Sequence, residues 1–231
     1  MKGKLIVIEG TDCSGKETQT KLLESKLNKE GFPTKIVSFP KYDSPTGKIV
    51  GACYLGKEEL CKKYLNNENG WFKEGATNVS WMVSSLYYAA DRKYNIDEIE
   101  GLLNSGINVI LDRYTFSNMA HQGGKIDNQK DRFQFFKKIE ILEFDILELP
   151  KPDLVVLLYV PFQITLELLK NRGELDQNEL DKEHLKKAEQ TYLELKALYH
   201  FQMIECTKDN QMRSIEDINK ELEQKVKKLI K

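Results

Sequence analysis

Short apolar runs alternate with longer amphipathic stretches along the chain. The first run, residues 5–8, reads Leu-Ile-Val-Ile and contains no polar position. Continuous apolar character over so few residues is typical of a strand that is buried on both faces of a sheet. Further strands are expected at residues 34–39, 107–114, 153–160 and 201–206. Five such strands separated by helices predict an α/β fold with a five-stranded parallel sheet and helices on both of its faces.

Apolar residues at helical spacing predict the covering helices. The expected helices span residues 17–29, 46–65 with a break near Gly56, 77–94, 162–171, 182–199 and 215–230, with a helix pair in 128–149. Residues 66–75 are polar and contain glycine, so we expect a surface loop there. No internal repeat or low-complexity linker divides the chain, and we therefore expect a single domain over residues 1–231.

The turn after the first strand matches a phosphate-binding loop. Gly10 is followed by four residues, Gly15 and Lys16, at the junction between a predicted strand and a predicted helix. The glycines allow a tight turn, so that backbone N–H groups can point at phosphate oxygens at the positive end of the helix. The candidate ATP-binding residues are therefore Gly10, Thr11, Asp12, Cys13, Ser14, Gly15, Lys16, Glu17 and Thr18.

One position of this loop departs from the pattern. The residue after the lysine is usually Ser or Thr, whose hydroxyl holds Mg²⁺, but here it is Glu17, and Thr18 follows. Because each helical residue turns by about 100°, Thr18 does not replace that hydroxyl. Either Glu17 supplies an oxygen to the metal, or water and phosphate oxygens hold it.

Polar residues follow the predicted strands at the edge of the sheet where ligands bind in parallel α/β folds. Asp112 and Arg113 follow the apolar part of the third strand, in the charged cluster at its end. Arg113 suits forked binding of a phosphate, although a purely structural pair would have the same sequence. Tyr88 and Arg92 share one helix face, either to sandwich a planar base or to pack into the core. Asp12 either caps its own loop or points across the cleft to an acceptor hydroxyl.

Composition narrows the class of protein. Apolar residues make up 40% of the chain and charged residues 31%, which indicates a folded core, and the net charge of −1 argues against a basic nucleic-acid surface. No apolar run approaches the ~18 residues of a membrane span, and no signal peptide is evident. Four cysteines without CxxC pairing suit a reducing compartment. We expect a cytoplasmic protein without nucleic-acid or membrane partners.

Together these motifs resemble those of the thymidylate kinase family of P-loop nucleoside monophosphate kinases. The resemblance follows the family's order across nearly the whole chain, through 10–19, Phe39-Pro40-Lys41-Tyr42, 88–92, Asp112-Arg113-Tyr114 with Ser117, Ala120 and Gln122, and an Arg172 segment leading to 192–195. It implies a three-layer α/β/α sandwich with a lid at about 172–182. The implied activity is transfer of the γ-phosphoryl group of ATP to dTMP, with Mg²⁺, in dTTP biosynthesis.

The resemblance also implies roles for individual residues. Asp12 would orient the sugar 3′-hydroxyl, Arg113 with Tyr42 or Lys41 would grip the acceptor phosphate, and Asp112 would act through the Mg²⁺ shell. Tyr88 would stack on thymine while Arg92 reaches the base edge. The implied catalytic residues are Asp12, Lys16, Arg113, Asp112 and Arg172, and Arg172 would fold over the ATP phosphates. The implied dTMP-binding residues are Asp12, Phe39, Pro40, Tyr42, Tyr88, Arg92, Arg113, Ser117, Asn118, His121 and Gln122. Glu17 and Asp112 are the metal candidates.

Two departures from the family pattern bear on chemistry and specificity. Cys13 stands where relatives often carry Arg or Gly, so Arg172 or Lys182 would have to supply the missing charge from an unusually acidic segment. His121 replaces an aromatic residue that closes against the sugar 2′ position, which could loosen the choice of deoxyribose over ribose. None of the three histidines has metal-ligand spacing; His184 is expected on a helix face and His200 in a structural role.

Two other functions stay open at this point. One is a related kinase of deoxynucleosides or of another nucleoside monophosphate, and the other is a catalytically weak nucleotide-binding module, which Glu17 favours. Family members are commonly homodimers that pack helices face to face. The stripe formed by Val79, Met82, Val83 and Leu86 suits such an interface and suits a core face equally well.

Overall fold

The computed structural model describes residues 2–66, 69–170 and 181–231. At its centre is a parallel sheet of five strands in the order β2-β3-β1-β4-β5. The strands are β1 (Leu5–Gly10), β2 (Thr34–Ser38), β3 (Asn108–Asp112), β4 (Leu154–Tyr159) and β5 (Gln202–Glu205). All five lie where apolar runs predict them, so the expected α/β fold with a five-stranded parallel sheet is confirmed.

The helices are α1 (Lys16–Lys29), α2 (Pro45–Lys48), α3 (Glu58–Tyr64), α4 (Trp81–Tyr94), α5 (Ile96–Asn104), α6 (Thr115–Gly123), α7 (Gln129–Glu140), α8 (Phe162–Leu169), α10 (Lys182–Leu198) and α11 (Ile215–Ile230), with π-helical turns η1 (Ile49–Tyr54) and η2 (Ile141–Ile146). A hairpin of β6 (Thr207–Lys208) and β7 (Gln211–Met212) precedes α11. The sequence patterns predicted most of these elements but not α5, α6 or the hairpin.

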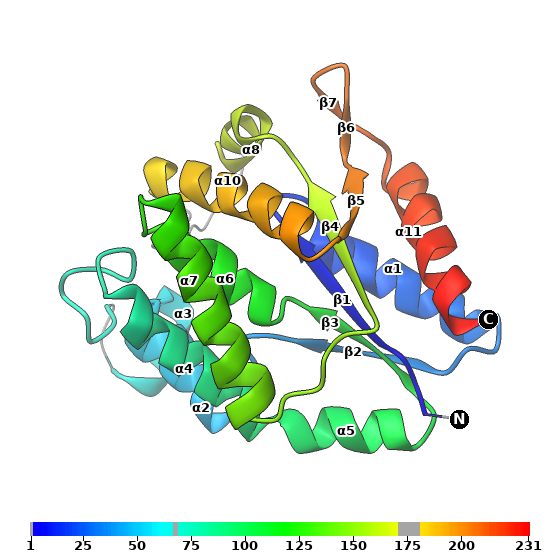
Figure 1. Ribbon diagram of the computed structural model, residues 1–231, viewed down its shortest axis with the longest axis horizontal. Helices are drawn as coiled ribbons and strands as arrows, with labels where there is room; N and C mark the ends of the chain where they lie inside the picture. The colour runs from blue at the N-terminus through cyan, green and yellow to red at the C-terminus, as the bar shows by residue number, and fades with distance from the viewer. Residues whose placement is uncertain (1, 67–68, 171–180) are drawn as a thin grey trace.

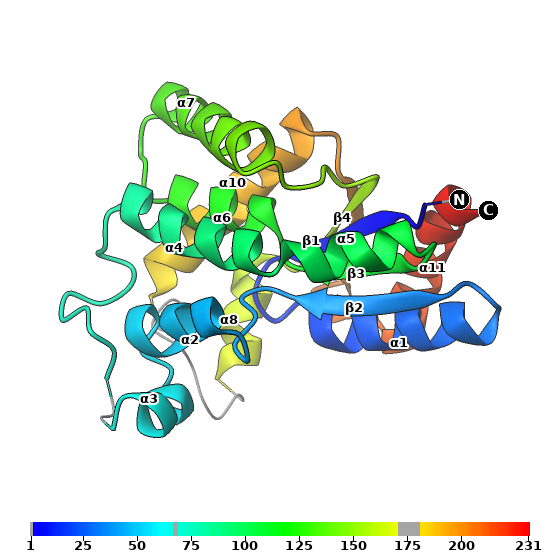
Figure 2. The same cartoon turned by 90° about the horizontal axis from the view of Figure 1, so that it is seen from below.

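Alternate residues of β1 face the two sides of the sheet. Ile6 and Ile8 pack with α1 and α11, whereas Leu5 and Val7 pack with α5. A third apolar cluster joins α6, α7 and α10 over Leu157 of β4. Figure 2 shows α1 and α5 on opposite sides of the sheet. Helices α2, α3 and α4 gather beyond one end of the sheet, away from the chain termini (Figure 1).

Two helical predictions need correction. Helix α4 begins at Trp81 rather than near residue 77, because the carbonyl oxygens of Ala76 and Val79 accept hydrogen bonds from Lys125 Nζ, at 3.0 and 2.9 Å, instead of from helical amides. Residues 128–149 do not form a helix pair: α7 continues directly into the wider π-helical turn η2, which carries the fully buried Glu143.

Candidate active site

The loop between β1 and α1 is held in place from both sides. Gly15 has φ of 75° and forms the N-cap of α1, a conformation that favours glycine. A side chain at Gly10 would lie 2.8 Å from the carbonyl oxygen of Leu158, so that position has no room for one. Thr11 Oγ1 donates to the carbonyl oxygen of Val160 and accepts from its N–H, both at 2.9 Å. These contacts fix the loop against the end of β4.

Lys16 is enclosed by this loop. Its Nζ donates to the carbonyl oxygens of Gly10 and Thr11, at 2.9 and 3.1 Å, and to Ser14 Oγ at 3.4 Å. Burial lowers the pKa of Lys16 to about 8, and the neighbouring Arg113 guanidinium acts in the same direction. The ammonium group therefore loses its proton more readily than an exposed lysine does.

This pKa predicts a pH dependence of nucleotide capture. The charged form of Lys16 attracts phosphate, and that form is lost as pH rises through about 8. We expect kcat/KM for ATP to fall between about pH 7.5 and 9.5, while kcat stays level because bound phosphates keep the ammonium protonated. In Lys16→Arg, whose side chain does not titrate in this range, the decline should disappear. A level kcat/KM profile for the unmodified protein would contradict the assignment.

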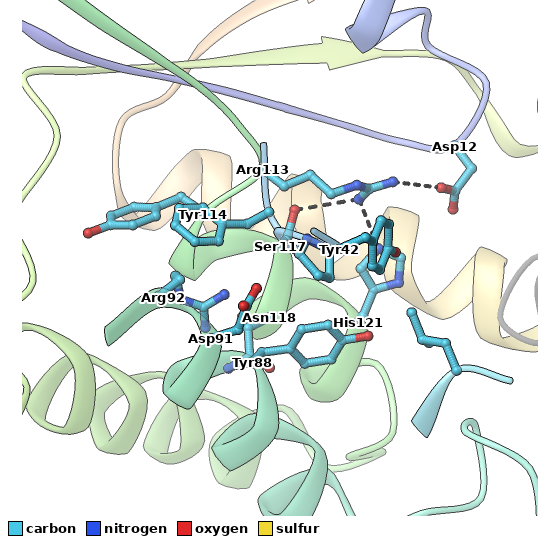
Figure 3. Close-up of a pocket in the computed structure, with 13 residues that line it drawn as sticks. Asp12, Tyr42, Tyr88, Asp91, Arg92, Arg113, Tyr114, Ser117, Asn118 and His121 are labelled. Carbon is cyan, nitrogen blue, oxygen red and sulfur yellow. Dashed lines mark hydrogen bonds and ion pairs between the residues drawn. The ribbon is translucent and has the colours of Figure 1, made fainter. Parts of the chain in front are cut away.

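A pocket opens beside the loop. Its lining comes from the phosphate loop, the turn after β2, the turn after β3, and helices α4 and α6 (Figure 3). The residues are Asp12, Phe39, Pro40, Tyr42, Leu55, Tyr88, Asp91, Arg92, Arg113, Tyr114, Ser117, Asn118 and His121. The structure thus brings together ten of the eleven residues predicted for dTMP binding.

Arg113 lies at the end of the pocket nearest the phosphate loop. Its Nη2 donates to Asp12 Oδ1 at 3.1 Å and its Nη1 to Ser117 Oγ at 3.5 Å. Burial raises the pKa of Asp12, but the charges around it, with Arg113 the strongest and Lys16 also contributing, together outweigh this effect and lower the pKa to about 2. Asp12 is therefore a carboxylate at neutral pH and acts as a hydrogen-bond acceptor across the cleft rather than as an acid.

Glu9 organises the turn that carries Arg113, and sequence reasoning missed it. Its fully buried carboxylate accepts from the N–H groups of Tyr114 and Ser117, at 3.0 and 3.1 Å, from Ser117 Oγ, and from Tyr192 Oη at 3.3 Å. Burial raises the pKa of Glu9. The available signal was a charged residue inside an otherwise apolar strand, directly before the first glycine of the loop.

The opposite end of the pocket rests on a buried ion pair. Arg92 Nε and Nη2 donate to the two oxygens of Glu143 at 2.6 and 2.5 Å, and the side chains are 2% and 0% exposed. The same carboxylate accepts from Thr115 Oγ1 at 2.7 Å and from Asn118 Nδ2 at 3.2 Å. Asn118 Oδ1 is buried without a hydrogen-bond partner among the described residues. Glu143 therefore does not bind two polar groups at this end of the pocket: the acceptor Asn118 Oδ1 and the donor Arg92 Nη1.

The turn after β2 is held by Asp91. This carboxylate is 1% exposed and accepts from the backbone N–H of Lys41 at 2.9 Å and from Thr46 Oγ1 at 2.8 Å. The Lys41 side chain pairs with Glu98 on α5 and does not line the pocket. Of the two residues expected to grip the acceptor phosphate beside Arg113, only Tyr42 borders the pocket.

Several other predicted residues lie outside the pocket. Gln122, which was expected to bind dTMP, does not line the pocket. Its side chain is buried in the protein interior on α6. His184 lies on helix α10, where it is buried and contacts His121. His200 is exposed. Arg172 and residues 171–180 of the expected lid lie outside the described residues.

The two metal candidates border a neighbouring cavity. Asp112 and Glu17 line it together with Arg113 and Tyr42, which also border the first pocket. Glu17 is 76% exposed and pairs with Lys21 at 2.5 Å. Among the residues described, no group of three or more His, Cys, Asp or Glu side chains forms a metal cluster. Two carboxylates beside a phosphate loop fit a hard cation that takes its other ligands from water and phosphate.

Comparison with known proteins gives a consistent picture. The family model described as thymidylate kinase matches residues 8–221. A thymidylate kinase from Plasmodium falciparum is 31% identical over 99% of this chain and 91% of its own length, and a probable thymidylate kinase from Pyrococcus horikoshii is 29% identical over 96% and 95%. The solved thymidylate kinase of Candida albicans superposes with a TM-score of 0.72 at 26% identity, covering 100% of this chain and 94% of that one.

Proposed function

The chain belongs to the thymidylate kinase family, and we infer that it transfers the terminal phosphoryl group of ATP to dTMP, giving dTDP and ADP. The observation that carries this function is one pocket that joins Arg113 and Asp12, beside the phosphate loop, to Tyr88, Arg92 and Asn118 at its far end. A nucleoside monophosphate has the same polarity, with an anion at one end and a planar base at the other.

We assign the far end of the pocket to the thymine base. Tyr88 supplies an aromatic face, and aromatic rings bind planar bases by stacking. The unpartnered Asn118 Oδ1 suits the N3–H donor of thymine, and Arg92 Nη1 suits a carbonyl oxygen of the base. Glu143 holds both side chains in these orientations, because its carboxylate binds Arg92 and Asn118 at once.

The near end binds the acceptor phosphate in this proposal. Arg113 and Tyr42 hold its oxygens, and Asp12 accepts from the sugar 3′-hydroxyl. One acceptor phosphate oxygen attacks the γ-phosphorus of ATP, the bond from that phosphorus to the β,γ-bridging oxygen breaks, and ADP leaves with the electron pair. Catalysis then depends on alignment and charge neutralisation, supplied by Lys16 and Arg113, rather than on a strong base.

We propose that ATP is used with Mg²⁺, which would screen the phosphate charges during transfer. Asp112 and Glu17 are the carboxylates that border the adjoining cavity and would reach the ion directly or through water. The cation proposed to compensate for Cys13 in the loop is Arg172 or Lys182, which lies at the start of α10. These assignments rest on residue chemistry and on the family.

The test of the function is coupled ADP production with ATP and Mg²⁺, offering dTMP, dUMP, dCMP, dGMP, UMP and thymidine separately. The panel is broad because the Candida albicans enzyme is described as having broad substrate specificity. A strong preference for dTMP supports the proposal. Preference for another acceptor would keep the phosphotransferase but refute the base assignment, and ATP binding without turnover would favour a nucleotide-binding module.

His121 bears on the choice of sugar. Its two ring nitrogens face Arg113 Nη1 at 3.4 Å and His184 Nε2 at 3.2 Å, so neither is left for a 2′-hydroxyl. The structure therefore argues for a stringent site rather than the relaxed one considered from the sequence. A buried hydroxyl without a partner costs 1–3 kcal/mol, or about 5- to 150-fold. We expect kcat/KM for the ribose analogue of dTMP to be lower by that factor; equal values would contradict this prediction.

The surface of α4 suits the proposed homodimer. Met82, Val83 and Leu86 are 37%, 41% and 49% exposed, whereas Val79 is buried in the core. The stripe is thus mainly a surface feature of the described chain, and a second copy would cover it. We also propose a single kinase domain over residues 1–231 and a cytoplasmic location, which four cysteines in the thiol form favour. Among the described helices, none is long and apolar enough to cross a membrane.

A further inference from the structure

Two histidines from different helices meet beside the proposed phosphate clamp. His121 lies on α6 and His184 on the first turn of α10, and the two helices pack against each other in Figure 1. His121 Nδ1 and His184 Nε2 are 3.2 Å apart, with ring planes inclined by only 20°. His184 is 6% exposed and does not line the pocket. Its contact with the pocket lining is made through His121.

The contact with Arg113 determines which ring nitrogens carry protons. The other nitrogen of His121, Nε2, lies 3.4 Å from Arg113 Nη1 (Figure 3). A guanidinium has donors and no acceptor, so Nε2 of His121 must be the acceptor and bear no proton. The proton of a neutral His121 is then on Nδ1, which donates to His184 Nε2. His184 must in turn accept at Nε2.

We propose that His184 is a positioning residue, which fixes the tautomer of His121 and thereby keeps an acceptor in place for the Arg113 guanidinium. Arg113 is then held from three sides, by Asp12, by Ser117 and by His121. Without an acceptor at residue 184, the buried Nδ1–H of His121 has no partner. The His121 ring can then rotate, or its proton can move from Nδ1 to Nε2. A proton on Nε2 would point at an N–H of Arg113, and Arg113 would lose its acceptor.

The position of His184 is itself well defined. Its backbone N–H donates to Asp181 Oδ1 at 3.0 Å, which is the N-cap contact of α10. Leu185 and Ala188, on the same helix, are 4% and 3% exposed. Because the cap and the buried neighbours hold this turn, a substitution of the ring alone changes the hydrogen bond without removing the helix. That property makes the proposal testable by side-chain replacement.

The test compares His184→Phe, which retains a ring without an acceptor, with His184→Gln, whose amide oxygen can accept from His121. The inference rests on the proposed dTMP kinase activity. We expect His184→Phe to raise KM for dTMP about 10-fold, equivalent to about 1.4 kcal/mol, and to leave KM for ATP within about 2-fold. His184→Gln should return KM for dTMP to within about 2-fold of the unmodified protein. His200→Asn, at an exposed histidine, is the control and should change neither constant.

A double-mutant cycle separates this role from simple packing. In a His121→Phe background the donor to residue 184 is gone, so adding His184→Phe should change KM for dTMP by less than about 2-fold. A further 10-fold loss, or equal kinetics for His184→Phe and His184→Gln, would overturn the proposal. Absence of dTMP turnover in the unmodified protein would instead refute the proposed function.

A spectroscopic readout on the unmodified protein keeps the test independent of turnover. Imidazole ¹⁵N spectra of the unmodified protein, assigned with His184→Gln and His200→Asn, report the tautomer of each ring. A proton on Nδ1 and none on Nε2 of His121 at neutral pH is the expected result. A proton on Nε2 of His121 would overturn the proposal whatever the kinetics show.

Discussion

Replacing Arg113 by alanine is expected to lower kcat/KM for dTMP about 100- to 1,000-fold, the largest effect on activity that the structure predicts. Arg113 is the cation that the pocket places next to Asp12 at the end facing the phosphate loop. Its loss leaves the incoming phosphate without its forked partner and leaves Asp12, which is a carboxylate at neutral pH, to repel that phosphate. Steady-state kinetics with dTMP as the varied substrate measure the effect.

Two further variants show whether the loss is specific. Arg113→Lys keeps the charge but not the fork, so it should recover only part of the activity. Arg213→Ala removes an arginine that pairs with Glu221 beside the β6–β7 hairpin, outside the pocket lining, and should leave kcat/KM within about 2-fold. Near-normal turnover of Arg113→Ala, with its fold intact by circular dichroism, would refute the assignment of the phosphate clamp.

The second large effect concerns stability. Glu143→Ala is expected to lower the free energy of unfolding by about 3–5 kcal/mol, because it leaves the Arg92 guanidinium buried without a counter-ion. Arg92 is 2% exposed and makes both charge-assisted hydrogen bonds of the pair with Glu143. Thr115 and Asn118 lose their acceptor as well. Urea denaturation of the protein without ligands measures the change.

The matched controls separate burial from charge. Replacing both partners, as Arg92→Met with Glu143→Leu, removes the charges together and should be less destabilising than Glu143→Ala alone. Glu58→Ala breaks an exposed pair with Lys62, whose side chains are 56% and 55% exposed, and should cost less than about 1 kcal/mol. If Glu143→Ala lowers the free energy of unfolding by less than about 1 kcal/mol, water reaches Arg92 and the ion pair does not hold this end of the pocket in place.

Several features of this protein follow from short stretches of sequence alone. The apolar run of β1 and the spacing from Gly10 to Lys16 predict a strand, a phosphate loop and the start of α1, and the structure has them there. Helix α11 has the predicted bounds, Ile215 to Ile230. In each case the cause is local: the spacing of side chains a few residues apart determines which face is buried, and the left-handed position at Gly15 favours glycine.

Elements whose ends depend on distant partners were predicted less well. Helix α4 begins late because Lys125, more than forty residues further along the chain, binds the carbonyl oxygens of Ala76 and Val79. The sequence patterns do not predict helix α6, whose residues Thr115 to Ala120 are all buried. Its polar side chains satisfy Glu9 and Glu143 inside the protein, and composition alone does not distinguish such residues from exposed ones.

The sequence by itself indicated the fold class and the phosphate loop, and its resemblance to a known family implied ten of the residues that line the pocket. Only the tertiary structure decided how those residues are oriented: Asp12 meets Arg113 across 101 positions, Arg92 meets Glu143 across 51, and His121 meets His184 across 63. Backbone periodicity specifies which face of an element a side chain occupies. The partner on the facing element depends on helix packing and strand order, so the hydrogen bonds that direct each charge become visible only once the chain is folded.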